Sequence, residues 1–312
     1  MRDSQCWFYE EEQGVSDRRI PAADPWRPGP MALNADLDPW RLPPSELCWW
    51  CGERATTGEH RIKHSTLKRI ARTDSGVIDL NNTYKMADDF EGPLRSLKKG
   101  AQVKWRTNMC ATCNNAKSQP FDMAYDTMEN FIVTNADHMG TWSRLAWVDV
   151  FGAEWQQSAT NLGRYFAKQV CCMLATQRLP IPEDLITFLD GSPRCPSVAF
   201  MTFRNWRAVD AHRTLRGAGL DDGITTFVGL LPNKAYQQDG HLAGVDYGYH
   251  IGYIWFLANW TEGSDRSSWW EHPVIDIPQV NCNLGSRVTW RLSRMRHRWE
   301  TPQDPGGAAV DK

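Results

Sequence analysis

Hydrophobic residues at steps of three and four predict a long helix in the middle of the chain. The positions that follow this spacing are Trp155, Ala159, Leu162, Phe166, Val170 and Met173. Such spacing places side chains on one face of a helix, where they pack against a core. A second helix is predicted from Phe121 to about Asn135, with Pro120 at its first position. Its apolar face is formed by Phe121, Tyr125, Met128 and Ile132.

Strand-like segments dominate the last third of the chain. Runs rich in β-branched and aromatic residues occupy 198–203, 225–231, 247–260 and 287–292, separated by turns that contain Gly or Pro. Before them, 180–191 predicts a turn and a short helix. Nearer the N-terminus, 101–109 alternates well enough for a strand, and Ser65 is placed to cap a short basic helix through Arg72. The whole pattern predicts an α+β fold with a C-terminal unit of helices and antiparallel sheet.

Length and composition divide the chain into two folded units and two irregular ends. A chain of 312 residues has room for about two domains. Residues 1–47 are rich in proline and lack a sustained period, so we expect an irregular leader that contacts the folded body through Trp26 or Trp40. Residues 48–137 form the first predicted unit, 138–300 an α+β unit of unassigned role, and 301–312 a disordered tail.

Cysteine usage and hydropathy predict a cytoplasmic protein without membrane association. No apolar run reaches the roughly 18 residues of a membrane span, and the N-terminus lacks the apolar segment of a secretory signal. The chain has nine cysteines. Five of them show no disulfide framework, as expected for free thiols in a reducing compartment; these are Cys6, Cys171, Cys172, Cys195 and Cys282.

The other four cysteines form two C-x-x-C pairs, Cys48 with Cys51 and Cys110 with Cys113. Each pair puts two thiolates on one tight turn, and two such turns supply the four ligands of a tetrahedral structural zinc site. Buried free thiols are the alternative, and the spacing makes them much the less favoured. Between the pairs lie a carboxylate and an imidazole side by side, Glu59 and His60, and an amide, Asn114, follows the last cysteine directly.

This order of residues resembles the HNH endonucleases, also called ββα-metal nucleases, in the subgroup whose hairpin and helix are tied together by a structural zinc. The resemblance covers about 90 residues, from Cys48 to the end of the helix near Asn135. It implies an N-terminal ββα-metal nuclease module. The C-terminal half lies outside it, and we expect that half to select a target, a protein partner or a trigger.

The resemblance implies a role for each residue of the motif. His60 corresponds to the general base that deprotonates the attacking water, and Glu59 and Asn114 correspond to the ligands of one catalytic Mg²⁺ or Mn²⁺. Oxygen ligands suit such a cation, and a histidine that titrates near neutral pH can accept the proton. The expected reaction is hydrolysis of a phosphodiester, leaving a 5′-phosphate and a 3′-hydroxyl. A bacterial or phage setting, in defence, restriction or mobile elements, is typical of the family.

Nucleic acid is the expected partner, with DNA favoured over RNA. Residues 53–117 contain 13 Lys and Arg against 7 Asp and Glu, although the whole chain has a net charge of −2. A local excess of positive charge is what binding to a phosphate backbone requires, although a solvated surface explains it about as well. Lys117 corresponds to a phosphate-contacting lysine of the family. Further candidate contacts are Arg61, Lys63, His64, Lys68 and Arg69.

Two departures from the family pattern leave an alternative function open. The segment between His60 and Cys110 is longer than is usual, and the middle Asn of the motif has no fixed counterpart among Asn81, Asn82 and Asn108. Zinc-bound modules are also common as structural or binding elements without catalysis. The alternative is therefore a zinc-dependent module that binds nucleic acid or protein and cuts nothing.

Aromatic residues in the C-terminal half allow two interpretations. Tyr247, Tyr249, Tyr253 and Trp255 are expected on one face of a strand, with His250 on the other. Sheet core is the favoured interpretation, because alternating aromatics are typical of a half-buried strand. A stacking platform for bases or a small ligand is the other.

Overall fold

The structure, a computed structural model, describes residues 31–32, 38–72, 75–80, 83–87, 90–206, 208–210, 213, 228–230, 234–238, 241–266 and 268–280. Within these ranges it combines helices with a mainly antiparallel sheet, which confirms the mixed α+β class predicted from the sequence. Most of the leader, including Trp26, the predicted strand at 287–292 and the tail lie outside the described residues.

Both long helices form where the apolar spacing predicts them. Helix α5 spans Trp155–Gln177, and α2 spans Gln119–Thr134 with a proline in its first turn. The short helix predicted in 180–191 is α6, Glu183–Leu189. The remaining helices are α1, His64–Ala71, α3, Ala136–Met139, and α4, Trp147–Phe151. Among the described residues, no helix combines the length and the apolar character that crossing a membrane requires.

The main sheet has seven described strands in the order β1, β7, β8, β9, β5, β11, with β6 also paired to β8. All the pairs are antiparallel except β11 with β5. The strands are β1, Met31–Ala32, β5, Val198–Asn205, β6, Val228–Leu230, β7, Lys234–Gln238, β8, His241–Ile251, β9, Ile254–Thr261, and β11, Gln279–Val280. Two small pairs lie apart from it: β2, Tyr84–Ala87, with β3, Phe90–Pro93, and β4, Arg144–Ala146, with β10, Val274–Asp276.

One face of the sheet packs on α5. Tyr249 of β8 lies opposite Phe256 of β9, and the ring of Phe166 on α5 contacts both, with centroids 6.1 and 5.2 Å apart. The predicted run 247–260 is therefore a hairpin of two strands, and its aromatics belong to the sheet core. One part of that prediction is wrong: Trp255 lies opposite His250, so these two share the other face, away from Tyr249.

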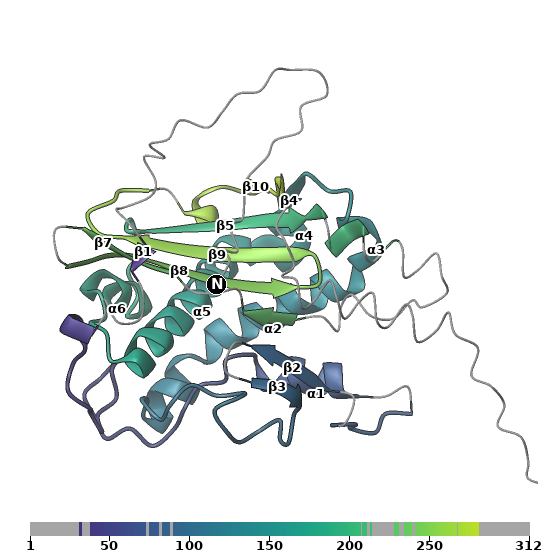
Figure 1. The fold of residues 1–312 in the computed structure, drawn as a ribbon. Coiled ribbons are helices and arrows are strands. Elements are labelled where there is room, and N and C mark those ends of the chain that lie inside the picture. Colours follow the sequence, from purple (N-terminus) through teal and green to yellow (C-terminus); the bar gives the residue numbers. More distant parts are fainter. Residues whose placement is uncertain are drawn as a thin grey trace, which may run out of the picture.

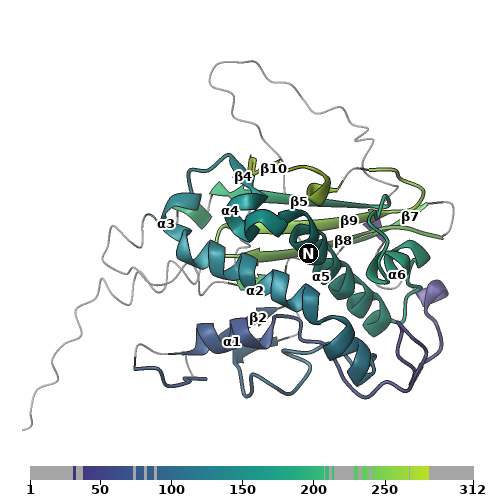
Figure 2. The same cartoon turned by 180° about the vertical axis from the view of Figure 1, so that it is seen from behind.

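Figures 1 and 2 show three layers. The sheet forms the first layer, α2 and α5 with their neighbouring helices form the second, and the segments around α1 form the third. One cluster of buried residues extends through the molecule from Cys48 through Phe121 and Phe166 to Ile277. Trp40 also packs against it, as expected for the end of the leader. Buried residues on both sides of the boundary predicted at 137/138 belong to this cluster.

Two local predictions in the first half are wrong. Ser65 lies inside α1 and donates a hydrogen bond to Asp126 (3.1 Å), while Lys63 precedes the helix and makes no capping bond with its side chain. The segment 101–109 is not a continuous strand; its first residues form a turn, and isolated bridges join Lys104 to His60 and Met109 to Thr57.

Candidate functional site

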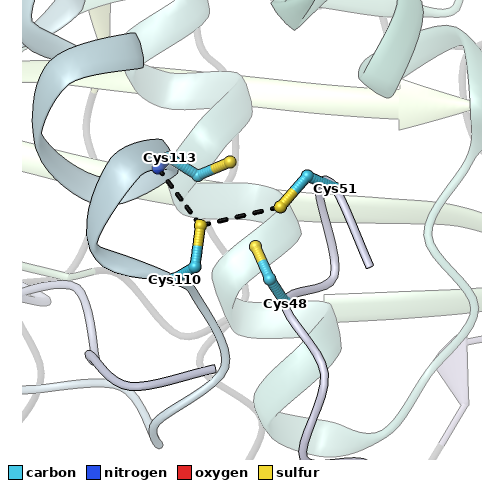
Figure 3. Close-up of side chains that lie close together, drawn as sticks. All are labelled: Cys48, Cys51, Cys110 and Cys113. Carbon is cyan, nitrogen blue, oxygen red and sulfur yellow. Dashed lines mark hydrogen bonds between the residues drawn. The ribbon is translucent and has the colours of Figure 1, made fainter. Parts of the chain in front are cut away.

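Four thiols converge where the first half of the chain folds back on itself. Cys48 and Cys51 lie on a tight turn, and Cys110 and Cys113 lie at the start of a helical segment (Figure 3). All four sulfur atoms lie within 4.8 Å of one another, and the Sγ atoms of Cys51 and Cys110 are 3.6 Å apart. This confirms that the two pairs predicted from spacing form one cluster.

The cluster fits a tetrahedral metal ion such as zinc. With Zn–S bonds of about 2.3 Å, sulfur atoms in a tetrahedron lie about 3.8 Å apart. The backbone N–H of Cys113 donates to Sγ of Cys110 (3.4 Å), and this bond is the main cause that lowers the pKa of Cys110 to about 7. At neutral pH a thiol with that pKa is about half in the form of the thiolate that zinc requires. The four cysteines would hold the ion, whose role here is structural.

Backbone pairing between 57–61 and 103–109 forms a hairpin that leads directly into the second cysteine pair. The N–H of Trp105 donates to the carbonyl of Glu59 (2.9 Å), and the N–H of Arg61 to that of Val103 (2.9 Å). Gly58 permits this approach, because a Cβ at that position would lie 2.5 Å from the carbonyl oxygen of Trp105. A turn of π-helix, Thr112–Lys117, and α2 then follow. Glu59 and His60 are held on this hairpin.

His60 is kept neutral at neutral pH by its surroundings. Burial is the largest cause that lowers its pKa to about 4; the charges of Lys104 and His64 contribute to this shift, and a hydrogen bond with the Leu97 backbone opposes it. Its ring stacks on that of His64, with centroids 5.3 Å apart. Among the described residues, its buried Nε2 atom has no hydrogen-bond partner. A neutral imidazole with an unoccupied nitrogen can accept a proton.

Glu59 is buried against α5. Glu59 is 8% exposed and Lys168 is 0% exposed. The ammonium of Lys168 lies 3.3 Å from Oε2 of Glu59, and the side-chain amide of Gln169 lies 3.5 Å from Oε1. Burial raises the pKa of Glu59, and the charge of Lys168 acts against that shift. Gln169 also donates to the carbonyl of His60 (3.1 Å) and accepts from the indole of Trp105 (2.8 Å). Helix α5 therefore positions the strand that carries both residues.

The ammonium of Lys168 joins Glu59 to α2. It lies 3.2 Å from Oδ1 of Asp122 and donates to Oγ of Ser118 (3.2 Å). Sequence reasoning missed Lys168 and Asp122. Lys168 could have been identified from its position in the long helix, because it is a charged residue within a run of residues that form the core. Asp122 follows Phe121, a core position of α2, and carried no comparable signal.

Asn114 lies within this polar region. Its backbone carbonyl accepts from the hydroxyl of Ser118 (3.1 Å), the same hydroxyl that contacts Lys168. Its buried Oδ1 has no hydrogen-bond partner among the described residues. An unpaired amide oxygen fits a ligand of a hard cation. Glu59 fits less simply, because the ammonium of Lys168 already balances its charge.

Asn108 does not orient His60. Its side-chain amide donates to the carbonyl of Cys172 (3.1 Å) and to Oγ1 of Thr176 (3.3 Å), both on α5. The hydrogen bond that contributes to the pKa of the His60 ring is made instead with the backbone of Leu97. The other two candidates for the middle Asn, residues 81 and 82, lie outside the described residues.

Four of the six predicted nucleic-acid contacts have partners inside the fold. Lys117 pairs with Asp190 (2.5 Å) and lies over the ring of Trp50, and Arg61 lies 4.7 Å from the ring centre of Trp105. The other two dock α1 on α2: Lys63 pairs with Asp126 (2.6 Å), and Arg69 with Glu129 (2.8 Å). Lys63 and Arg69 therefore have partners between these helices, and their contact with nucleic acid stays a prediction.

The other two contacts are His64, which stacks on His60, and Lys68, one of three lysines that form a cationic group around His64. The charges of Lys68, Lys98 and Lys104 act with burial to lower the pKa of His64. Lys68 and Lys98 are exposed. This cationic group therefore lies beside the ring of His64, which stacks on that of His60.

Comparisons of the chain with family models, with curated proteins and with solved structures give no match.

Proposed function

We propose that this protein is a metal-dependent endonuclease of the HNH type, which hydrolyses phosphodiester bonds in DNA. The observation that carries the proposal is the hairpin of Glu59 and His60, which is followed by Asn114 and tied together by the four-cysteine cluster. Pairing of 57–61 with 103–109 and the helix that follows supports a ββα arrangement. It agrees with the order of elements that the sequence resemblance implies.

In the proposed reaction, His60 acts as the general base. Its neutral imidazole accepts the proton of the attacking water, and the resulting positive charge is stabilised by the phosphate that enters the site. Glu59 and Asn114 would hold one Mg²⁺ or Mn²⁺, which stabilises negative charge on the phosphate and on the leaving oxygen. Lys68, Lys98 and Lys104 hold the backbone through its charge, which positions the strand without reading its sequence.

A zinc-dependent binding module remains the second candidate, and one observation favours it. Lys168 balances the carboxylate of Glu59 in a buried ion pair, as it would in a purely structural site. The two candidates differ in whether phosphodiester bonds are broken. In the binding module the same cationic group would hold nucleic acid, and the nucleic acid would not be cleaved in the presence of any metal.

The nuclease is tested by incubating zinc-loaded protein with supercoiled plasmid in Mg²⁺ or Mn²⁺. We expect open circles and then linear DNA that ligase can reseal, because the ends should carry 5′-phosphates and 3′-hydroxyls. EDTA added together with the metal should stop the reaction. Binding of the plasmid without cleavage under every metal would reject the nuclease and support the binding module.

The pKa of His60 predicts the pH dependence of cleavage. Because the free protein holds this pKa at about 4, kcat/KM should stay level as the pH falls from 7.5 to about 5.5, where an ordinary histidine would already be protonated. The same shift lowers stability as the pH falls from the unfolded pKa, about 6.5, towards 4, because only the unfolded chain takes up the proton. A fall in kcat/KM centred near pH 6.5, in protein that retains zinc, would contradict this assignment.

A further inference from the structure

A buried group of three charges lies beside the proposed catalytic residues. Lys168 is 0% exposed, and its ammonium lies 3.3 Å from Glu59 and 3.2 Å from Asp122. The ammonium therefore lies within ion-pair distance of both carboxylates. The two carboxylates and one ammonium leave the group with one excess negative charge.

The charge of this group matches a divalent cation better than it matches a lysine. Two carboxylates balance one divalent ion, whereas an added divalent ion next to Lys168 would leave a net positive charge in a buried place. Glu59 and Asp122 come from the hairpin and from α2, and Lys168 enters between them from α5. The ammonium therefore lies where a metal held by both carboxylates would lie.

Two residues next to this group carry buried polar atoms that have no hydrogen-bond partner among the described residues. The hydroxyl of Tyr165, a residue 1% exposed, has no hydrogen-bond partner among the described residues, and its ring centre lies 5.7 Å from the ammonium of Lys168. Oδ1 of Asn114 is likewise buried and unpaired.

Solvent reaches the group through Asp122. Its side chain is 25% exposed, and it lines a hollow of about 450 Å³ together with Asn115, Ala116 and Gln119. A hydrated ion can therefore reach the carboxylate of Asp122 without passing through the core.

We propose that Glu59 and Asp122 form one cation site, for which the ammonium of Lys168 and a divalent metal ion compete. The inference rests on the proposed function for the use of the metal, and it adds Asp122 as a ligand and Lys168 as the residue that limits metal affinity. Binding of the ion displaces the ammonium, so the metal requirement of the nuclease is set by a helix outside the hairpin.

The test compares Lys168→Met with Lys168→Arg in zinc-loaded protein. Both variants disturb the same buried position, but only the first removes the positive charge. Binding of Mn²⁺, measured by electron paramagnetic resonance of the free ion without DNA, should be at least about tenfold tighter in Lys168→Met than in wild type, because a repelling charge is gone. Lys168→Arg should stay close to wild type. Equal Mn²⁺ affinity in wild type and Lys168→Met would overturn the proposal.

Thermal unfolding supplies a second measurement if Lys168→Met folds poorly. Mn²⁺ should raise its melting temperature, or restore a cooperative transition, much more than it does for wild type. The double variant Glu59→Gln with Lys168→Met removes both charges and should show no such rescue. Asp122→Asn in the wild-type background should weaken Mn²⁺ binding. Failure of Mn²⁺ to stabilise Lys168→Met would also overturn the proposal.

These readouts are independent of cleavage. If no plasmid is cut but Lys168→Met binds Mn²⁺ tightly, the cation site stands and the proposed nuclease fails. If the wild type cuts plasmid while Lys168→Met gains no affinity, the nuclease stands and the competition is rejected.

Discussion

Replacing His60 with alanine should reduce metal-dependent plasmid nicking by about a thousandfold, the usual order for loss of a general base. The imidazole is the group in this site that is held neutral and has a buried nitrogen without a partner among the described residues. Binding of DNA should change little, because the cationic residues around it remain. The measurement is the initial rate of conversion from supercoiled to open-circular plasmid, with binding followed separately in Ca²⁺.

His138→Ala is the matched control for this substitution. His138 is an exposed histidine on α3, so its replacement removes an imidazole without touching the hairpin. It should cut at the wild-type rate. A rate within a few fold of wild type in His60→Ala, together with a normal melting temperature, would remove His60 from the reaction.

Replacing Cys110 with serine should release the zinc and unfold the protein. Structural zinc sites contribute roughly 10 kcal/mol or more to folding in small domains, which exceeds the stability of many whole proteins. Cys110 also belongs to the same buried cluster as the core of α5 and the sheet. We therefore expect loss of the cooperative melting transition of the whole chain, together with loss of the single zinc ion measured by atomic emission.

Cys195→Ser is the control, because Cys195 is buried in the same hydrophobic cluster but lies outside the four-thiol group. It should retain one zinc ion and a cooperative transition. Wild-type protein that contains no zinc, or Cys110→Ser that melts like wild type, would show that the cluster is a set of ordinary buried thiols.

The parts of the fold that sequence could predict are those specified by neighbours along the chain. Helix α5 follows from spacing of apolar residues over five turns, and the thiol cluster follows from two short motifs. The cap at Ser65 failed because the preferred contact of its hydroxyl is Asp126, on a different helix. The strand at 101–109 failed because its partner segment is reached only through a long insertion, which leaves two bridges in place of a ladder.

The charges of the site were the hardest to predict, because each is settled by a distant partner. Glu59 and Lys168 are separated by more than a hundred positions, and their pairing depends on how α5 docks on the hairpin. Arg69 reads as a surface charge in a basic segment, but Glu129 holds it inside the fold. Counting charges in a sequence therefore gives the net charge of a segment. Which of those charges are exposed to solvent depends on burial in the fold.

The contacts from α5 to the hairpin have a consequence for how such a protein can evolve. Gln169 and Lys168 hold Glu59 and the backbone of His60, and residues one turn later hold Asn108. The motif could therefore not be moved alone into another protein, because the residues of α5 that support it lie about fifty positions after Lys117. Any change that shifts α5, including a change on the sheet that it covers, would alter the positions of Glu59 and His60. The hairpin and α5 would therefore have to diverge together.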